Sequence, residues 1–494
     1  QGTYYPDQNE VNPLGTGARA ASFQLLDGMA LKGGYAGLGA PDPDARDVTA
    51  NQTVLTGDLN DDDLSVTINR EDNTYHVITG SGTDATATLD GFTVAGGNDV
   101  RPSPDGRGGG MLNNNGSPTI QHCTFVDNRA LIGGAMANLS GSGSTLSDCG
   151  FTGNRAEQQG GAIYNQQTSG AAFTNCTFDG NTSSVSGGGM LNFLSSPTVN
   201  NCAFVGNLAS SGGGMENISN SHATLTDCTF RDNIAETYGG GIASAISNPT
   251  LTGCVFTGNS AHAEGGGIRI VSGSPTLINC VFSGNSSDLN GGAINSNAGS
   301  SPGMINCTLS GNSAQSGGGL LIAGSSTPAI TNCILWNNSD ASGAGEAAQV
   351  LVVQGTPIVN FSSIQGLTGL LGGVGNTGAD PLFIDADGAD DLTGTEDDDL
   401  HLSPNSPLID AGDNNGVPAD ILTDLDGNPR FVDDPNTPDS GTGTAPIVDL
   451  GAYELPGGGQ PIPTVSQWGF AAMALLLLTA GTAVFIRFRP ATAP

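Results

Sequence analysis

The residues best suited to chemistry in this chain are aspartates near its C-terminal end. Asp385, Asp387 and Asp390 form an Asp-x-Asp-Gly-x-Asp run around Gly388. Carboxylate oxygens at such spacing are ligands that Ca²⁺ prefers, although the glycine of an EF-hand loop comes two positions later. We therefore predict these three aspartates as candidate metal ligands and Ca²⁺ as the candidate cofactor.

A second acidic stretch, Asp58–Asp63, is followed by Arg70. A solvated turn is the simpler interpretation, and a Ca²⁺ loop is the functional one. Enzymes that cleave acidic polysaccharides need carboxylates together with Arg or Lys on one face. A charged cluster of these residues on the folded surface would therefore favour an enzyme, whereas an uncharged face would favour a binding or structural protein.

The remaining charged candidates are dispersed. Arg129 and Arg155 are 26 residues apart without a column of carboxylates beside them, and they form either an anion site or a solvated pair. The five histidines do not cluster in the sequence. We predict that the chain is not an enzyme, and we keep a polysaccharide lyase or glycoside hydrolase as the alternative.

Composition excludes one class of partner. The 494 residues carry a formal net charge of −34, and Lys32 is the single lysine. Binding to a phosphate backbone requires a basic surface, so we predict no nucleic-acid partner. An acidic, lysine-poor chain suits an exported protein. The chain opens at Gln1, so either its start was processed or the sequence is a fragment, and we favour a fragment because residues 2–5 are typical of a strand entered midway.

The elements that must position these residues come from a repeat between Gly108 and Asn338 with a period of 26 or 27 residues. All nine cysteines lie in it, an asparagine follows each of them after five residues, and a phenylalanine follows seven of them after two. The cysteines are Cys123, Cys149, Cys176, Cys202, Cys228, Cys254, Cys280, Cys307 and Cys333. The asparagines are Asn128, Asn154, Asn181, Asn207, Asn233, Asn259, Asn285, Asn312 and Asn338.

A period this short indicates one supersecondary unit stacked on copies of itself. The repeat is too rich in glycine for helices, because glycine costs about 1 kcal/mol at each helical position. Cysteine and the phenylalanine two residues later point the same way on a strand, while glycine pairs and asparagines supply the bends. We therefore predict an all-β fold, a parallel β-helix with coils of about 26 residues stacked about 4.8 Å apart.

Stacking would turn each position of the repeat into a column. Buried asparagines can bond to the asparagine and the backbone of the next coil, which satisfies polar groups at the bends. The cysteines would form an apolar column of free thiols, since their number is odd and their positions are equivalent. A metal or redox stack is the alternative, but the chain contains no CxxC motif or Cys/His cluster that would favour it.

The repeat divides the chain. One more coil would follow it, with Phe361 in the cysteine column. The acidic segment after that coil would cap the open end of the solenoid, because an exposed last coil presents unpaired backbone groups to which another chain could bind. The predicted units are irregular β-helix coils with long acidic loops (1–107), regular coils (108–365), the cap segment (366–455), a linker (456–461) and the tail (462–494).

The tail contains an apolar run from Phe470 to Ile486 that is just long enough to cross a bilayer as a helix. Arg487 and Arg489 follow it and would stay cytoplasmic, and Trp468 would lie at the opposite interface. We predict a transmembrane helix that makes the membrane a partner and leaves residues 1–455 outside. The helix either anchors them or is cleaved off.

Two resemblances extend this interpretation. The pairing of Phe-x-x-Asn with Gly-Gly-Ala-Met/Ile, as in Phe125/Asn128 with Gly134-Ala135-Met136, resembles the polymorphic outer membrane protein repeats of bacterial surface proteins. It covers about 230 residues. The resemblance implies a right-handed parallel β-helix exposed outside the cell and often adhesive. The chain departs from those proteins in lacking their C-terminal β-barrel translocator.

The segments 402–413, 424–430 and 448–454 look like the domain of choice-of-anchor surface proteins, which carry interchangeable C-terminal anchors. The tail is similar to an IPTL-type sorting signal, although Val465 replaces the usual leucine, and a sorting protease is the partner that this implies. The sorting residues are Ile462, Pro463, Thr464, Trp468, Gly469, Arg487 and Arg489. We therefore expect a non-enzymatic protein of the cell surface, outer membrane or extracellular space. Its role would be adhesive or structural, and an extracellular glycan or a neighbouring cell surface would be its partner.

Overall fold

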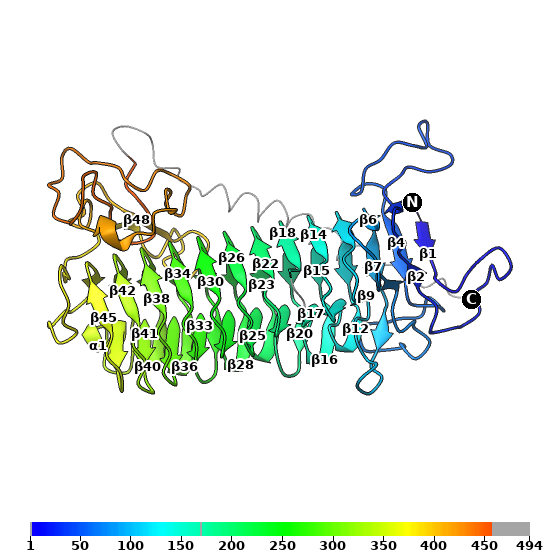
Figure 1. The fold of residues 1–494 in the computed structure, drawn as a ribbon, viewed down its shortest axis with the longest axis horizontal. Helices are drawn as coiled ribbons and strands as arrows, with labels where there is room; N and C mark the ends of the chain where they lie inside the picture. The colour runs from blue at the N-terminus through cyan, green and yellow to red at the C-terminus, as the bar shows by residue number, and fades with distance from the viewer. Residues whose placement is uncertain (1, 168–169, 457–494) are drawn as a thin grey trace.

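The computed structural model describes residues 2–167 and 170–456. Over these residues the chain winds into a parallel β-helix, drawn as a horizontal rod in Figure 1. Equivalent strands of successive coils pair in parallel and in register, so that Phe125 lies opposite Phe151 and Phe151 opposite Phe178. The predicted all-β parallel solenoid is therefore confirmed.

A regular coil contributes four strands, and in the described residues these build four long sheets, named here sheets 1 to 4 in the order in which a coil visits them. Sheet 1 contains β3 (Ala30–Lys32), β6 (Thr88–Asp90), β10 (Thr119–Gln121), β14 (Thr145–Ser147), β18 (Ala172–Thr174), β22 (Thr198–Asn200), β26 (Thr224–Thr226), β30 (Thr250–Thr252), β34 (Thr276–Ile278), β38 (Gly303–Ile305), β42 (Ala329–Thr331) and β45 (Ile358–Asn360). Sheet 2 contains β1 (Gly2–Tyr4), β4 (Thr53–Thr56), β7 (Thr93–Ala95), β11 (Thr124–Val126), β15 (Gly150–Thr152), β19 (Thr177–Asp179), β23 (Ala203–Val205), β27 (Thr229–Arg231), β31 (Val255–Thr257), β35 (Val281–Ser283), β39 (Thr308–Ser310), β43 (Ile334–Trp336) and β46 (Ser363–Ile364).

Sheet 3 contains β8 (Asn98–Asp99), β12 (Arg129–Ile132), β16 (Arg155–Gln159), β20 (Thr182–Ser183), β24 (Leu208–Ser211), β28 (Ile234–Tyr238), β32 (Ser260–Ala261), β36 (Ser286–Asn290) and β40 (Ser313–Ser316). Sheet 4 contains β2 (Phe23–Gln24), β5 (Ile78–Thr79), β9 (Met111–Asn114), β13 (Met136–Leu139), β17 (Ile163–Gln166), β21 (Met190–Phe193), β25 (Met215–Ile218), β29 (Ile242–Ala245), β33 (Ile268–Val271), β37 (Ile294–Asn297), β41 (Leu320–Ile322) and β44 (Val350–Val352). The described residues also contain a short helix α1 (Glu346–Gln349) just before β44, and then an antiparallel pair of strands, β47 (Phe383–Asp385) and β48 (Asp399–Leu402), and a 3₁₀ turn η1 (Asn414–Gly416) after β46.

The backbone conformation at the bend between sheets 1 and 2 explains which residue types precede the cysteines. That residue has a positive φ of 49° to 62° in every regular coil. Asn, Asp and Gly adopt this left-handed conformation at low cost, whereas most other residues are strained there. The bend residues are His122, Asp148, Asn175, Asn201, Asp227, Gly253, Asn279, Asn306 and Asn332.

The core of the rod consists of the predicted columns. All nine cysteines are buried and free, and the seven phenylalanines stack with ring centroids 4.5 to 5.2 Å apart. The asparagine ladder is also confirmed, since Asn128 Nδ2 donates to Asn154 Oδ1 at 3.1 Å and the pattern continues to Asn338. A second ladder in sheet 4, which the sequence analysis missed, joins Asn113, Asn138, Asn165, Asn192 and Asn217.

The last coil departs from the prediction by one residue. Val359 pairs with Ile330 and Ser363 with Ile334, so Ser362 stands in the cysteine column. Its Oγ accepts from the Cys333 backbone N–H at 3.1 Å and donates to Asn360 O at 2.9 Å. Phe361 instead occupies the bend with φ 44°. The prediction for Phe361 was wrong because strand alternation alone cannot locate the residue that bends.

The segment 366–455, which we predicted to cap the open end, has two parts in the structure. Residues 366–378 bond to the edge of the last coil, as in Ile364 N–H to Thr377 O at 2.9 Å, and Leu367 and Leu371 pack against the core. Residues 379–456, which we call the lobe, fold back along the side of the last coils (Figure 1, orange). The lobe buries Leu400 and Ala452 against Val281, an outward residue of sheet 2.

The described residues contain no helix long and apolar enough to cross a membrane. The predicted transmembrane helix and the sorting residues Ile462, Pro463, Thr464, Trp468, Gly469, Arg487 and Arg489 lie outside the described residues, as does most of the linker.

Candidate functional site

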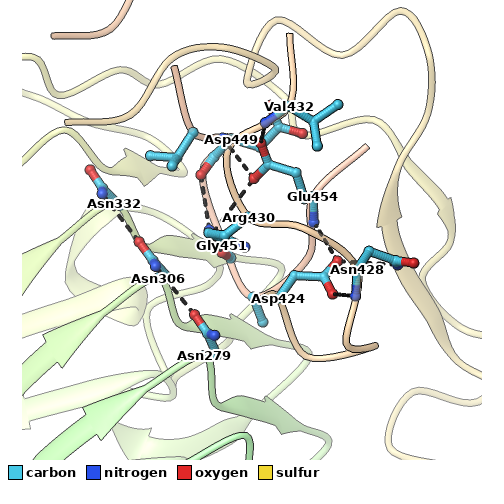
Figure 2. Close-up of polar contacts among 12 residues, drawn as sticks. Asn279, Asn306, Asn332, Asp424, Asn428, Arg430, Val432, Asp449, Gly451 and Glu454 are labelled. Atoms are coloured by element: carbon cyan, nitrogen blue, oxygen red, sulfur yellow. Dashed lines mark hydrogen bonds and ion pairs between the residues drawn. The ribbon is translucent and has the colours of Figure 1, made fainter. Parts of the chain in front are cut away.

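The bend residues of the last coils form the surface on which the lobe docks. Asn332 Nδ2 donates to Asn306 Oδ1 at 3.1 Å, and Asn306 Nδ2 donates to Asn279 Oδ1 at 3.2 Å (Figure 2). These three side chains are buried, whereas Asn175 and Asn201, at the same position of earlier coils, are exposed. The lobe therefore covers a ladder that the other coils present to solvent.

The lobe is bonded to this ladder in both directions. Asn332 Nδ2 donates to Asp413 O at 3.1 Å, and Asp413 N–H donates back to Asn332 Oδ1 at 2.8 Å. Gly451 N–H donates to Asn332 O at 2.8 Å, and Asn279 Nδ2 donates to Thr423 O at 2.8 Å. The segments singled out as choice-of-anchor motifs thus lie at or next to the contacts that hold the lobe on the solenoid.

A buried arginine joins two of these motifs. Arg430 is 0% exposed, and its Nη2 donates to Asp449 O at 3.1 Å and to Gly451 O at 2.5 Å (Figure 2). Its Nε lies 3.6 Å from Glu454 Oε2. Because removal of one partner from a buried ion pair leaves an uncompensated charge, this group of residues holds the lobe together.

The two carboxyls beside Arg430 hold protons more tightly than usual. Burial raises the pKa of Asp449 to about 7, against the opposing effect of backbone donors and of Arg430. Burial and the nearby Asp449 carboxylate also raise the pKa of Glu454. Glu454 accepts from the backbone N–H groups of Asp449 and Val432 at 3.2 and 3.3 Å. Both carboxyls are almost fully enclosed, so the arrangement is a structural one rather than a reaction centre.

His401 is bound to two carboxylates, which its position in the sequence did not reveal. Its Nδ1 lies 2.6 Å from Asp399 Oδ1 and its Nε2 lies 2.7 Å from Asp426 Oδ2. Burial would lower the pKa of His401, but the bonds to Asp399 and Asp426 raise it to about 9. The ring centroid lies 4.0 Å from that of Tyr453. Both ring nitrogens are engaged, so neither can act as a base toward a substrate.

The structure does not bring the predicted metal ligands together. Within the described residues, carboxylate oxygens converge to within 4.8 Å in two groups, Asp58 with Asp62 and Asp72, and Asp410 with Asp433 and Asp439. Asp385, Asp387 and Asp390 belong to neither group. Asp390 Oδ1 instead accepts from the Leu392 N–H at 2.9 Å, which closes its own turn.

The charged cluster expected near Asp58–Asp63 is present, but its arginine is not available to a ligand. Arg70 is 4% exposed, and its Nη1 and Nη2 both donate to Asp127 O, at 2.8 and 2.6 Å. Its Nε lies 3.3 Å from Asp63 Oδ2. Burial raises the pKa of Asp63 to about 6 despite this arginine. The guanidinium thus ties an N-terminal loop to the first regular coil.

The candidate anion site at Arg129 and Arg155 is already neutralised. Glu157 Oε1 lies 2.8 Å from the Arg129 Nη2 and 3.0 Å from the Arg155 Nε. The repeat does not reveal this carboxylate, because Glu157 stands alone two residues after Arg155 and does not recur at the same position of successive coils. A depression of about 360 Å³ lies beside this group and is lined by Leu208 and Glu236 among others.

Two family models and one solved structure are similar to parts of this chain. Residues 107–286 match a family model described as a right-handed β-helix region, and residues 279–297 match the Chlamydia polymorphic membrane protein repeat. The sequence matches none of the curated proteins compared with it. A crystal structure of pectate lyase Pel9A is similar with a TM-score of 0.36 and 15% identity, over 74% of this chain and 88% of that one. The chain is thus a right-handed β-helix protein with a repeat of the polymorphic membrane protein type.

Proposed function

We propose that this chain is an exported, non-enzymatic β-helix protein of the bacterial cell surface, with an adhesive role. The observation that carries the proposal is a column of threonines on the outer face of sheet 1. Thr198, Thr224 and Thr250 lie opposite one another in adjacent strands, and all three side chains are exposed. Strand spacing places their hydroxyls about 4.8 Å apart along the outer face of the sheet.

Such a column suits a neutral extracellular glycan better than a charged partner. Each hydroxyl can donate and accept, and a rigid scaffold loses little entropy when a long ligand lies along it. The similarity of residues 279–297 to the repeat of a polymorphic membrane protein supports the surface location.

The adhesive role is tested by binding of the purified chain to a glycan array and to neighbouring bacterial cells. Replacement of Thr198, Thr224 and Thr250 by valine keeps the β-branched shape and removes the hydroxyls, so binding should fall by at least about tenfold. The matched control replaces Thr177 and Thr229 of sheet 2 by valine and should bind normally. Equal binding by both variants would exclude the threonine column as the adhesive surface.

The surface location is tested by fractionation of cells that express the full chain or a chain ending at Gly458. We expect the full chain to remain with the cell envelope and the shorter chain to be released. If both partition identically into the medium with the tail still attached, the surface assignment loses its main support.

A carbohydrate-active enzyme is the second candidate, because Asp58, Asp62 and Asp72 converge within 4.8 Å near Arg70. Both Arg70 Nη atoms already donate to Asp127 O, which argues against an enzymatic role for this group. We expect no turnover of pectin or alginate, with or without Ca²⁺. Turnover that disappears in Asp62→Asn would reverse the ranking of the two functions.

A further inference from the structure

Two separate segments of the lobe bring three carboxylates to one point. Asp410 follows Ile409, which packs on the flank of the solenoid, while Asp433 and Asp439 belong to a loop further along the chain. One oxygen from each residue lies within 4.8 Å of the others. Asp410 is fully buried and the other two are exposed, so the group has an enclosed base and an open rim.

Asp410 is held rigidly, and one of its oxygens has no partner. Its backbone N–H donates to Asp449 Oδ1 at 2.8 Å, and its carbonyl accepts from Ser440 and Gly441 N–H at 2.9 and 3.0 Å. Its Oδ2 accepts from the Asp434 N–H at 3.3 Å. Its Oδ1 is buried without a hydrogen-bond partner among the described residues. An unsatisfied buried carboxylate oxygen is costly, so this atom calls for a ligand.

The group also lacks a positive charge. The ion pairs found in the described part of the lobe involve Glu396, Asp399, Asp426 and Glu454, and none involves Asp410, Asp433 or Asp439. Mutual repulsion of three carboxylates at such distances destabilises the fold unless a cation or protons relieve it. A lysine cannot be the missing partner, because Lys32 is the only one in the chain and lies in β3 at the other end of the rod.

We propose that Asp410, Asp433 and Asp439 form a Ca²⁺ site that fastens the loop 431–441 to the base of the lobe. Oxygen-only ligands favour a hard cation over zinc or copper. Ca²⁺ accepts about six to eight oxygen ligands in flexible geometry, whereas Mg²⁺ demands near-ideal octahedral geometry, so three carboxylates from two separate segments favour Ca²⁺. Water completes the coordination at the open rim.

The ion would stabilise the docked lobe. Asp413, three residues after Asp410, carries the reciprocal bonds to Asn332, so ordering of the loop around Asp410 also supports the contact with the solenoid. With three carboxylates and an open rim, we expect a dissociation constant of about 10⁻⁴ to 10⁻³ M, the range of extracellular calcium modules. This inference is independent of whether sheet 1 is adhesive.

The test is hydrogen–deuterium exchange of the full chain in EDTA and in about 10 mM Ca²⁺, read on peptides covering residues 431–442. We expect Ca²⁺ to slow exchange there in the native protein. The doubly substituted chain Asp433→Asn/Asp439→Asn should lose at least about tenfold in calcium affinity and show no such slowing. Both side chains are exposed, so the substitutions remove ligands without opening the core.

A matched control carries Asp58→Asn and Asp62→Asn in the N-terminal acidic group and should keep the calcium effect on 431–442. Exchange in EDTA provides the folding check, because loss of repulsion should leave the lobe of the doubly substituted chain at least as protected as that of the native chain. Asp439→Asn alone should weaken the effect of calcium on exchange, while exchange of its lobe in EDTA should match that of the doubly substituted chain. An absence of any calcium effect in the native chain, or an effect that survives Asp433→Asn/Asp439→Asn, would overturn the proposal.

Discussion

Replacement of Asn207 by alanine in the middle of the ladder should weaken the solenoid locally. Asn207 Oδ1 accepts from the Asn181 backbone N–H and from Asn181 Nδ2, both at 3.0 Å. Its own Nδ2 donates to Phe178 O and to Asn233 Oδ1, both at 2.9 Å. Asn181 Nδ2 keeps its bond to Phe151 O, so the full penalty of an orphaned donor falls on the Asn181 backbone N–H.

The magnitude follows from these bonds. An orphaned buried donor costs about 1–3 kcal/mol, and each of the three other lost bonds costs about 0.5–1.5 kcal/mol, so we expect a local loss of about 5 kcal/mol. Each 1.4 kcal/mol is a factor of ten in an equilibrium constant, so amides near residue 181 should exchange roughly 4,000-fold faster. Stability in stacked repeats is largely a nearest-neighbour property, so distant coils should change little.

The assay is hydrogen–deuterium exchange by mass spectrometry on peptides that cover the coil around Asn181. Asn200→Ala is the matched control, because Asn200 is half-buried on the outer face of sheet 1, away from the ladder. A surface substitution of this kind is expected to change stability by less than about 0.5 kcal/mol. If Asn207→Ala accelerates exchange no more than Asn200→Ala, the ladder does not satisfy the buried groups as argued.

Three further predictions concern the core and the lobe. Phe230→Ala removes a ring stacked at 4.6 and 4.8 Å on its neighbours and should lower the free energy of unfolding by about 3–5 kcal/mol, measured by urea unfolding; a loss below about 1 kcal/mol would contradict the packing. Alkylation of the denatured chain should label all nine cysteines, whereas the native chain should react slowly because burial raises the pKa of Cys123 to about 12; disulfide-linked peptides would refute the free thiols. His401 has a folded pKa of about 9 against about 6.5 unfolded, so its contribution, about 3 kcal/mol at most, is fully present below pH 6.5 and is lost as the pH rises through 9. His401→Gln should therefore flatten the pH dependence of lobe exchange between these values, and an unchanged profile would argue against the two ion pairs.

The fold was largely predictable because the same pattern of residues recurs nine times along the chain. One cysteine two residues before a phenylalanine says little, but its recurrence places both side chains in the core and leaves strand stacking as the simplest way to bury them. Where the repeat decays, the same reasoning failed. Phe361 was assigned to the cysteine column that Ser362 occupies, since nothing local distinguishes a bend residue from its neighbour.

The candidate sites were much harder to predict. Asp385, Asp387 and Asp390 were chosen for their spacing, yet the carboxylates that converge in the lobe are those of Asp410 with Asp433 and Asp439, which come from two segments of the chain. The role of Glu157 between Arg129 and Arg155 was missed because this carboxylate does not recur at one position of the repeat. The predicted sorting signal around Trp468 stays a prediction, because it lies outside the described residues.

The sequence alone therefore determined the columns of the solenoid, because a periodic chain repeats each local preference until only one way of stacking satisfies all of them. It did not determine that the lobe turns back onto the flank at Asn332, or that Arg430 becomes enclosed between Asp449 and Glu454. Those contacts involve lobe residues that lie outside the repeat, so no sequence pattern relates them, and the energies of the contacts depend on burial and distance. Only the tertiary structure decided which carboxylates meet, which are neutralised and which are left without a partner.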